Sequence, residues 1–181
     1  MRKIVVSQFV TLDGVMEAPE KWNTKYLNDA ELVNEILADF AASDSLLFGR
    51  ATYEFFAARW PSRTGEMADM FISFPKHVVS TSLQKAEWNN SAIINANVST
   101  EIKTMKDKQG KNILVFGSYK LLQTLMTENL IDEYKIYVYP LTLGTGKRLF
   151  EEGAAGQNFK LIASKSFATE VLALTYEQKK P

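Results

Sequence analysis

The sequence predicts an α/β protein, a three-layer αβα sandwich with a mainly parallel sheet and antiparallel strands at the carboxyl end. Through residue 130, apolar segments of strand length alternate with amphipathic segments of helix length, which is typical of a parallel sheet covered on both faces. Residues 159–166 and 171–177 instead alternate in hydrophobicity, which predicts a terminal hairpin. The length of 181 residues, 46% of them hydrophobic, predicts a single domain over residues 1–181.

The first strand is predicted at residues 4–10, a β-branched and aromatic segment that ends before Asp13. Residues 13–26 show no periodicity, and a loop of this length within a compact domain is usually functional. A helix follows over 28–42, because Asn28 and Glu31 fit a capping box and apolar residues recur at helical spacing. The next predicted elements are strand 46–48, helix 52–58, helix 67–73 and strand 76–80.

The second half of the chain continues this alternation. Residues 92–94 predict a weak strand, and 99–106 predict a helix with Ser99 as its N-cap. Strand 113–116 leads through a glycine into helix 119–129. Strand 134–140 has large side chains on both faces, and we expect it near the end of the sheet. An open strand of this kind is prone to association, so we expect a homodimer.

Composition and charge exclude several classes of function. Basic and acidic residues balance at 21 each, which argues against nucleic acid or an anionic membrane as a partner of the whole surface. The absence of cysteine excludes disulfides, thiolate metal sites and a cysteine nucleophile. The sole histidine, His77, lies inside a predicted strand, so we interpret it as structural and expect no metal. Without a signal h-region or a membrane-length apolar run, we expect a cytoplasmic protein.

Two junctions of one kind are the most informative segments. Strand 113–116 passes into its helix through Gly117 and Ser118, which let the backbone approach a ligand closely. The first amides of a helix have no intrahelical partner, and such an end favours phosphate. Strand 46–48 passes through Gly49 in the same way. Either junction alone also fits ordinary turn chemistry, whereas the pair favours a phosphate-binding edge of the sheet.

Arg50 has the most specific interpretation among the charged residues. We expect it one strand away from Ser80, Thr81 and Ser82. A guanidinium and several hydroxyls together can bind a phosphate monoester, such as the 2′-phosphate that distinguishes NADP from NAD. Arg50 is therefore a hypothesis about cofactor choice.

Other candidates keep two interpretations each. Asp13 follows the central strand, at the edge where α/β proteins bind ligands, but an Asp-Gly turn also explains it. Trp22, Tyr53 and Trp60 either form the wall of an aromatic ligand pocket or fill the core. Residues 144–148 lack the spacing of a nucleotide-binding loop and predict a tight turn, whose Lys and Arg either bind an anionic substrate or are surface charges.

Short segments in a fixed order resemble the dihydrofolate-reductase-like superfamily, and within it the stand-alone homologues of the reductase domain of bacterial riboflavin biosynthesis proteins, the RibD C-terminal type. The matching segments are 11–17, 47–54, 78–80, 116–118, 130–133 and 140–146. The resemblance implies an NADPH-dependent oxidoreductase with hydride transfer like that of 5-amino-6-(5-phosphoribosylamino)uracil reductase. The alternatives are a dihydrofolate or broad-specificity reductase and a non-catalytic NADP-binding protein.

The resemblance also implies a set of site residues. The cofactor-binding residues are Val6, Ser7, Gly49, Arg50, Thr52, Ser80, Thr81, Gly117, Ser118, Tyr119, Lys120 and Leu121. The substrate-binding residues are Glu17, Trp22, Tyr53, Gly144, Gly146 and Lys147. Asp13 is the candidate catalytic residue, which would orient or protonate the substrate. A riboflavin-type reductase also needs a phosphate clamp, for which the candidates are Lys147, Arg148 and Arg59. Val33 stands near the place of the acidic residue that binds the pterin ring in dihydrofolate reductases, which argues against folate reduction.

Overall fold

A computed structural model describes residues 1–153 and 156–179 of the protein. The strands within these ranges form one sheet in the order β4-β3-β2-β5-β1-β6-β8-β7. Strands β1 to β6 pair in parallel, whereas β8 runs antiparallel to β6 and β7 runs antiparallel to β8. The bounds are β1 (Ile4–Thr11), β2 (Ser43–Gly49), β3 (Lys76–Val79), β4 (Ser91–Ile94), β5 (Asn112–Phe116), β6 (Glu133–Tyr139), β7 (Phe159–Ser166) and β8 (Leu172–Gln178).

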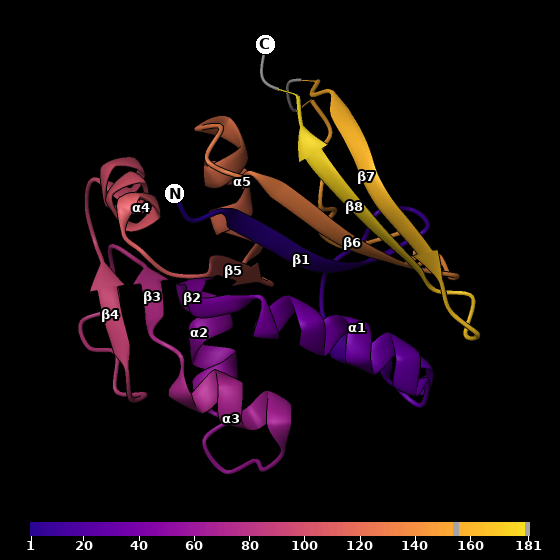
Figure 1. The fold of residues 1–181 in the computed structure, drawn as a ribbon, viewed down its shortest axis with the longest axis horizontal. Coiled ribbons are helices and arrows are strands. Elements are labelled where there is room, and N and C mark those ends of the chain that lie inside the picture. Colours follow the sequence, from indigo (N-terminus) through magenta and orange to yellow (C-terminus); the bar gives the residue numbers. More distant parts are fainter. Residues whose placement is uncertain (154–155, 180–181) are drawn as a thin grey trace.

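Helices cover both faces of this sheet (Figure 1). Helices α1, α2 and α3 lie on one face, and α4 and α5 lie on the other. The arrangement confirms the predicted αβα sandwich with antiparallel carboxyl-terminal strands. The bounds are α1 (Ala30–Ala41), α2 (Arg50–Ala57), α3 (Glu66–Ser73), α4 (Val98–Asp107) and α5 (Tyr119–Thr127), with short 3-10 turns at Pro19–Lys21 and Thr24–Tyr26.

Each face of the sheet has its own hydrophobic core. Because side chains alternate along a strand, Val6 of β1 packs with α4 and α5, while Phe9 packs on the side of α1, α2 and α3. The fully buried Phe40 of α1 and Phe71 of α3 belong to the second core, and their ring centroids are 5.0 Å apart. These two cores hold the strands of the sheet rigidly, so that the loops at its edges start from fixed positions.

The N-caps of two helices differ from the prediction. The N-cap of α1 is Asp29 and not Asn28, since the Asp29 carboxylate accepts hydrogen bonds from the amides of Glu31 and Leu32. Helix α4 starts after Asn97, a residue in the left-handed region, while the predicted cap Ser99 donates its hydroxyl to Glu128 at 2.9 Å. At α1, neighbouring polar residues could each cap the same backbone amides, and local sequence does not decide the outcome; at α4, Asn97 makes no side-chain capping hydrogen bond.

Strand β6 is not at the end of the sheet, which corrects the premise of the homodimer prediction. It pairs with β1 on one side and with β8 on the other, so its backbone groups are already bonded. Its tyrosines Tyr134, Tyr137 and Tyr139 fill the two cores. The outermost strands are β4 and β7. A homodimer stays a prediction without support from β6.

Lys76, at the start of β3, is a lysine with no exposed surface. Its Nζ donates to the carbonyl oxygens of Phe71 at 2.8 Å, Ile72 at 3.2 Å and Phe74 at 2.7 Å, and lies 4.5 Å from the centre of the Trp88 ring. The ammonium group thereby satisfies carbonyls that the end of α3 leaves without an amide partner. Burial lowers the pKa of Lys76 from 10.5 to about 8.

We expect Lys76 to make the protein more stable as the pH rises from about 8 to 10.5. In that window the unfolded lysine holds a proton and the folded one does not, so the free energy of unfolding increases with pH. A shift of this size corresponds to a gain on the order of 3 kcal/mol. Urea unfolding of the wild type and Lys76→Met at both ends of the window measures it, because the variant lacks this titration. Parallel pH curves for the two proteins would contradict the prediction.

Candidate functional site

A cavity of about 940 Å³ opens at the carboxyl ends of β1, β2, β3 and β5. This volume is in the range of cofactor and substrate sites. Its walls come from segments that are distant in the sequence but meet at one edge of the sheet. They are residues 7–9 of β1, 16–20 of the following loop, 49–52, 55 and 56 of the β2–α2 junction and α2, 79–82 after β3, 116–121 and 124 of the β5–α5 junction and α5, and Lys147.

The two predicted glycine junctions lie side by side in this wall. Strands β2 and β5 are paired, and the Gly49 amide donates to the Ser118 Oγ at 2.9 Å. Gly117 has φ of 75°, and a Cβ there would lie 3.1 Å from the Cγ2 of Thr52. Glycine is thus required at Gly117 both by the backbone angle and by the close approach of α2.

The helices that leave these junctions start without side-chain caps. Neither Gly49 before α2 nor Ser118 before α5 provides a capping hydrogen bond to its own helix. The hydroxyl of Ser118 is turned to Gly49 instead, because Ser118 has left-handed backbone angles. Two uncapped helix starts therefore face the cavity together, and such starts bind anions.

Arg50 and the polar segment after β3 stand together as predicted. The Nη1 of Arg50 donates to the Ser82 Oγ at 2.8 Å, and its Nε lies 3.3 Å from Glu54. The Ser80 Oγ accepts from the amides of Ser82 and Leu83, which shapes the turn. Arg50 is exposed, and the whole group lines the cavity. The guanidinium is free to turn part of its donors toward a ligand.

The end of the cavity beside β1 is lined by aromatic rings that the sequence analysis missed. Phe9 and Phe116 meet edge to face with ring centroids 5.2 Å apart, and Phe56 is stacked on Phe116 at 6.2 Å. Met16 and Pro19 of the loop after β1 also line this cavity. Phe9 follows Ser7 by two residues and so shares its face of the strand, which is the one sequence signal that pointed to it.

Gln8 is a polar residue at the floor of the cavity. Its Nε2 donates to the carbonyl oxygens of Val115 at 3.4 Å and Gly117 at 3.0 Å. Because two carbonyls accept from the amide nitrogen, the orientation of the amide is determined. Within the described residues, its Oε1 accepts no hydrogen bond from another side chain. That oxygen is an acceptor available to a ligand.

Several predicted site residues lie in the core and not at the cavity. Val6 is fully buried against α5. Trp22 donates its Nε1 to the Glu17 carbonyl at 3.0 Å and packs on Tyr139. The Tyr53 hydroxyl accepts from the Trp88 amide at 2.9 Å. For Trp22 and Tyr53, the core interpretation was the right one.

Asp13 connects two loops outside the cavity lining. Its carboxylate accepts from the Thr11 hydroxyl at 2.5 Å and from the amides of Gly144 at 2.7 Å and Leu143 at 3.3 Å, and these hydrogen bonds lower the pKa of Asp13 to about 2. Its carbonyl accepts from Arg148 at 2.9 Å. Because the carboxylate is engaged by Thr11 and by two backbone amides of the other loop, the geometry favours the turn interpretation. The predicted substrate residue Gly144 belongs to the same connection between the two loops, through its amide.

We expect Asp13→Ala to loosen the connection between the loop after β1 and the loop after β6. The amides of Leu143 and Gly144 lose their acceptor, so they should exchange with solvent roughly tenfold faster. Hydrogen exchange measured by NMR checks this. Asp13→Asn keeps an acceptor oxygen and should give an intermediate rate. Unchanged exchange in Asp13→Ala would mean that the loop is held by other contacts.

Glu17 and Lys147 form an ion pair at the rim. Their side chains are 3.0 Å apart, and the hydrogen bond from Lys147 lowers the pKa of Glu17. The Lys147 Nζ also lies 5.6 Å from the centre of the Tyr119 ring, whose hydroxyl bonds to Glu151. Gly146 lies beside them in a smaller hollow of about 410 Å³ and not in the main cavity. The pair links the loop after β1 to the loop after β6, and Lys147 also lies near Tyr119 at the start of α5.

Comparison with known proteins identifies the family. The family model of the RibD C-terminal domain matches residues 2–173. The chain belongs to the RibD C-terminal domain family. This confirms the resemblance inferred from the short motifs, which lie within the same residues. In the residues that the structure describes, no group of three metal-ligating side chains comes together, and no helix has the length and apolar composition to cross a bilayer.

Three individual relatives cover nearly the whole of this chain. The YyaP protein of Bacillus subtilis (strain 168) is 26% identical over 181 residues, covering 97% of this chain and 94% of YyaP. A putative riboflavin biosynthesis protein from Shewanella sp. PV-4 has a TM-score of 0.74 at 23% identity, with 98% and 99% of the chains covered. Dihydrofolate reductase from Enterococcus faecalis, solved with NADP(H), has a TM-score of 0.61 at 14% identity, with 98% and 97% covered. These structures share the fold.

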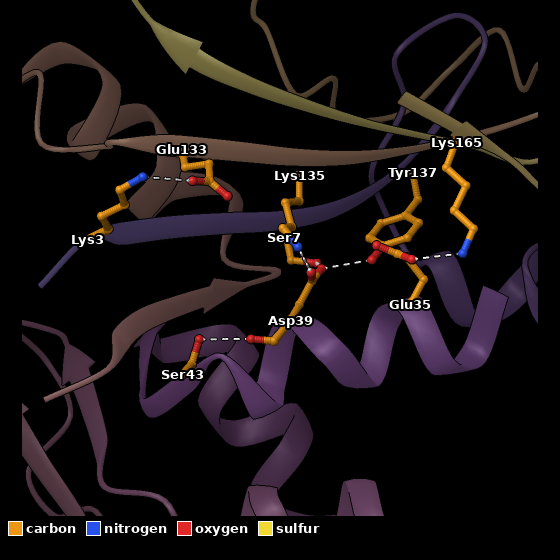
Figure 2. A network of polar contacts seen from close by, with 9 residues as sticks. All are labelled: Lys3, Ser7, Glu35, Asp39, Ser43, Glu133, Lys135, Tyr137 and Lys165. Carbon is orange, nitrogen blue, oxygen red and sulfur yellow. Dashed lines mark hydrogen bonds and ion pairs between the residues drawn. The ribbon is translucent and has the colours of Figure 1, made fainter. Parts of the chain in front are cut away.

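This member of the RibD C-terminal domain family also has a buried acid, Asp39, that contacts the cavity residue Ser7 (Figure 2). The Oδ2 of Asp39, on α1, accepts from the hydroxyls of Ser7 and Tyr137, each at 2.9 Å. The Nζ of Lys135 lies 2.5 Å from its Oδ1. Burial raises the pKa of Asp39, and Lys135 opposes that shift. The predicted cofactor residue Ser7 therefore lines the cavity, but its hydroxyl donates to Asp39. The sequence analysis missed this contact because α1 was identified from its apolar residues alone.

Proposed function

We propose that this protein is an NADPH-dependent reductase of the riboflavin-biosynthesis type. The observation that supports it is the junction pair: two uncapped helix starts share one cavity edge with Arg50 and Ser82. An edge of this kind suits a ligand with a diphosphate and a separate phosphate monoester. NADPH has both groups, and the related fold of Enterococcus faecalis dihydrofolate reductase was solved with NADP(H).

Under this proposal, each segment at the carboxyl edge of the sheet would bind a different group of NADPH. The opening amides of α5, at Tyr119 to Leu121, would bind the diphosphate, and Gly117 allows the turn that leads into this helix. Arg50, Ser80, Thr81 and Ser82 would bind the 2′-phosphate. Gly49 and Thr52 line the wall between these groups. The floor at Ser7 and Gln8 lies nearest to the end that is left for the nicotinamide.

The cofactor, when bound, supplies a hydride. The residues of this chain contribute position: the floor and the aromatic wall would hold an electrophilic carbon of the substrate at reacting distance and keep water away. No described carboxyl group in the lining is placed to donate a proton deep in the cavity, because Glu17 and Glu20 are exposed at its rim. We therefore propose positioning as the main catalytic contribution.

Titration calorimetry with NADPH tests the first step of the proposal. We expect a dissociation constant in the range of roughly 1 to 100 µM, as is usual for bound substrates of enzymes. Stopped-flow measurement of NADPH oxidation with pyrimidine, pterin and carbonyl compounds tests the second step. Binding without oxidation of NADPH by any compound would favour a non-catalytic NADP-binding protein. Oxidation with dihydrofolate alone would favour the dihydrofolate reductase alternative, and absence of binding would refute the proposal.

A further inference from the structure

We infer that Ser118 is a positioning residue that couples the two halves of the cavity edge, so that the preference of Arg50 for a 2′-phosphate depends on a hydroxyl at the start of α5. The inference rests on the proposed function in taking NADPH as the ligand that reports this coupling. Three features of the structure support it: the place where the pairing of two strands ends, one hydrogen bond that crosses the gap between them, and the backbone angles of Ser118.

The sheet divides at its carboxyl edge between β2 and β5. The backbone pairing of these two strands ends at Leu46 and Leu114, and no described pair follows. On either side the pairing continues further, between β2 and β3 as far as Gly49 and between β5 and β1 as far as Phe116. One half of the edge therefore consists of β2, β3 and α2 with Arg50, and the other half consists of β1, β5 and α5. Residues of both halves line the cavity.

One side-chain hydroxyl spans this division. The Ser118 Oγ accepts a hydrogen bond from the Gly49 amide at 2.9 Å. Among the described residues, no other hydrogen bond joins the two halves at this edge. The halves also pack closely here, because a Cβ on Gly49 would lie 3.5 Å from the Cβ of Leu121 and 3.8 Å from that of Ser118. Ser118 is only 7% exposed, so water has little access as a substitute acceptor for the amide.

The backbone of Ser118 lies in the left-handed region, with φ of 71° and ψ of 51°. This conformation costs free energy in a residue with a side chain, whereas glycine adopts it readily. A serine is therefore unfavourable for the local backbone, and its hydroxyl serves the start of α2 and not its own helix. What the serine contributes at this position is the acceptor oxygen for Gly49.

The position of Arg50 depends on the backbone that this hydrogen bond holds. Gly49 directly precedes Arg50, which is the first residue of α2. The guanidinium itself has only exposed contacts, 2.8 Å to Ser82 and 3.3 Å to Glu54, and exposed contacts of this kind restrain a side chain weakly. Without the Ser118 hydroxyl the Gly49 amide lacks its acceptor, and among the strands only β3 still holds the start of α2. Arg50 then shifts relative to α5.

Ser118→Gly and Ser118→Ala test the inference, because both lack the hydroxyl while only glycine favours the left-handed angles. Calorimetric titration gives the preference for NADPH, which is the Kd of NADH divided by the Kd of NADPH. We expect this preference to fall at least about threefold in both variants, since the 2′-phosphate then meets a displaced Arg50.

The control is Ser99→Ala, which removes a hydroxyl that bonds to Glu128 outside the cavity lining and should leave the preference unaltered. A fall in only one of the two Ser118 variants would assign the effect to the backbone and overturn the inference. An unchanged preference in both, which includes equal losses for NADPH and NADH, would also overturn it, as would an equal fall in Ser99→Ala.

Two further measurements separate this inference from the proposed function. Ser118→Gly added to Arg50→Ala should not lower the preference further, because the coupling acts through Arg50, and a further fall would contradict it. In the protein without nucleotide, NMR should show the Gly49 amide exchanging with solvent at least about tenfold faster in Ser118→Gly than in the wild type. Unchanged exchange would refute the coupling. If the wild type binds neither nucleotide, the proposed function is refuted, and the exchange of Gly49 still decides whether Ser118 joins the two halves.

Discussion

Arg50→Ala is expected to weaken NADPH binding by roughly tenfold to a hundredfold and NADH binding little. A guanidinium that donates to a dianionic phosphate contributes about 1.5 to 3 kcal/mol, and NADH has no 2′-phosphate to receive these bonds. Arg50 is exposed and already touches Ser82 at 2.8 Å, so the variant should fold normally. Calorimetric titration of both nucleotides into the wild type and the variant measures the effect.

Two further variants make this result specific. Glu54→Gln removes the partner 3.3 Å from the Arg50 Nε without touching the lining, and it should leave the preference for NADPH in place. Arg50→Lys keeps the charge but lacks the planar pair of donors and should lie between wild type and Arg50→Ala. Equal losses for NADPH and NADH would place Arg50 on the diphosphate or in the fold, and no loss would remove it from the site.

Asp39→Ala is expected to lower the free energy of unfolding by about 3 to 5 kcal/mol, the usual result of breaking a buried charged pair by removing one partner. The variant leaves the hydroxyls of Ser7 and Tyr137 without their acceptor and Lys135 without its counterion. It also leaves a void where the carboxyl group was. Urea unfolding at neutral pH, followed by circular dichroism, measures the loss.

Asp39→Asn is the matched control, because it keeps the shape and one acceptor oxygen. We expect it to destabilise the protein clearly less than Asp39→Ala. Lys135→Met removes the cation from the other side of the pair and should also be destabilising, since the buried carboxylate then lacks its counterion. A loss below about 1 kcal/mol in Asp39→Ala would show that the network contributes little to stability.

Local patterns were sufficient for the elements and for the edge of the sheet that we propose as the cofactor site. The periods of hydrophobic residues identified every strand and helix that the structure describes, because each element must bury one face or both. The glycines at Gly49 and Gly117 marked the two strand ends, although only Gly117 has a backbone angle that favours glycine, since Gly49 is in an ordinary extended conformation. Arg50 was placed beside Ser82 because neighbouring parallel strands end at the same edge. Each of these inferences depends on a few adjacent residues and on general rules of topology.

The end of the cavity beside β1 depended on contacts between distant segments, which single-sequence patterns do not encode. The ring wall joins Phe9, Phe56 and Phe116 from three elements, and the rim pair joins Glu17 to Lys147. The catalytic role of Asp13 stays a prediction, and the hydrogen bonds from its carboxylate to residues 143 and 144 could not be inferred from sequence patterns for the same reason.

The sequence by itself determined the αβα architecture, the family, and the edge with two helix starts and Arg50. Only the tertiary structure decided which charges are free and which are paired. It put β6 between two partners, Asp39 in contact with Ser7, and Lys76 against the end of α3. The physical reason is that backbone preferences and hydrophobic periods act over a few residues, whereas the state of a charge depends on partners that the fold brings from far along the chain.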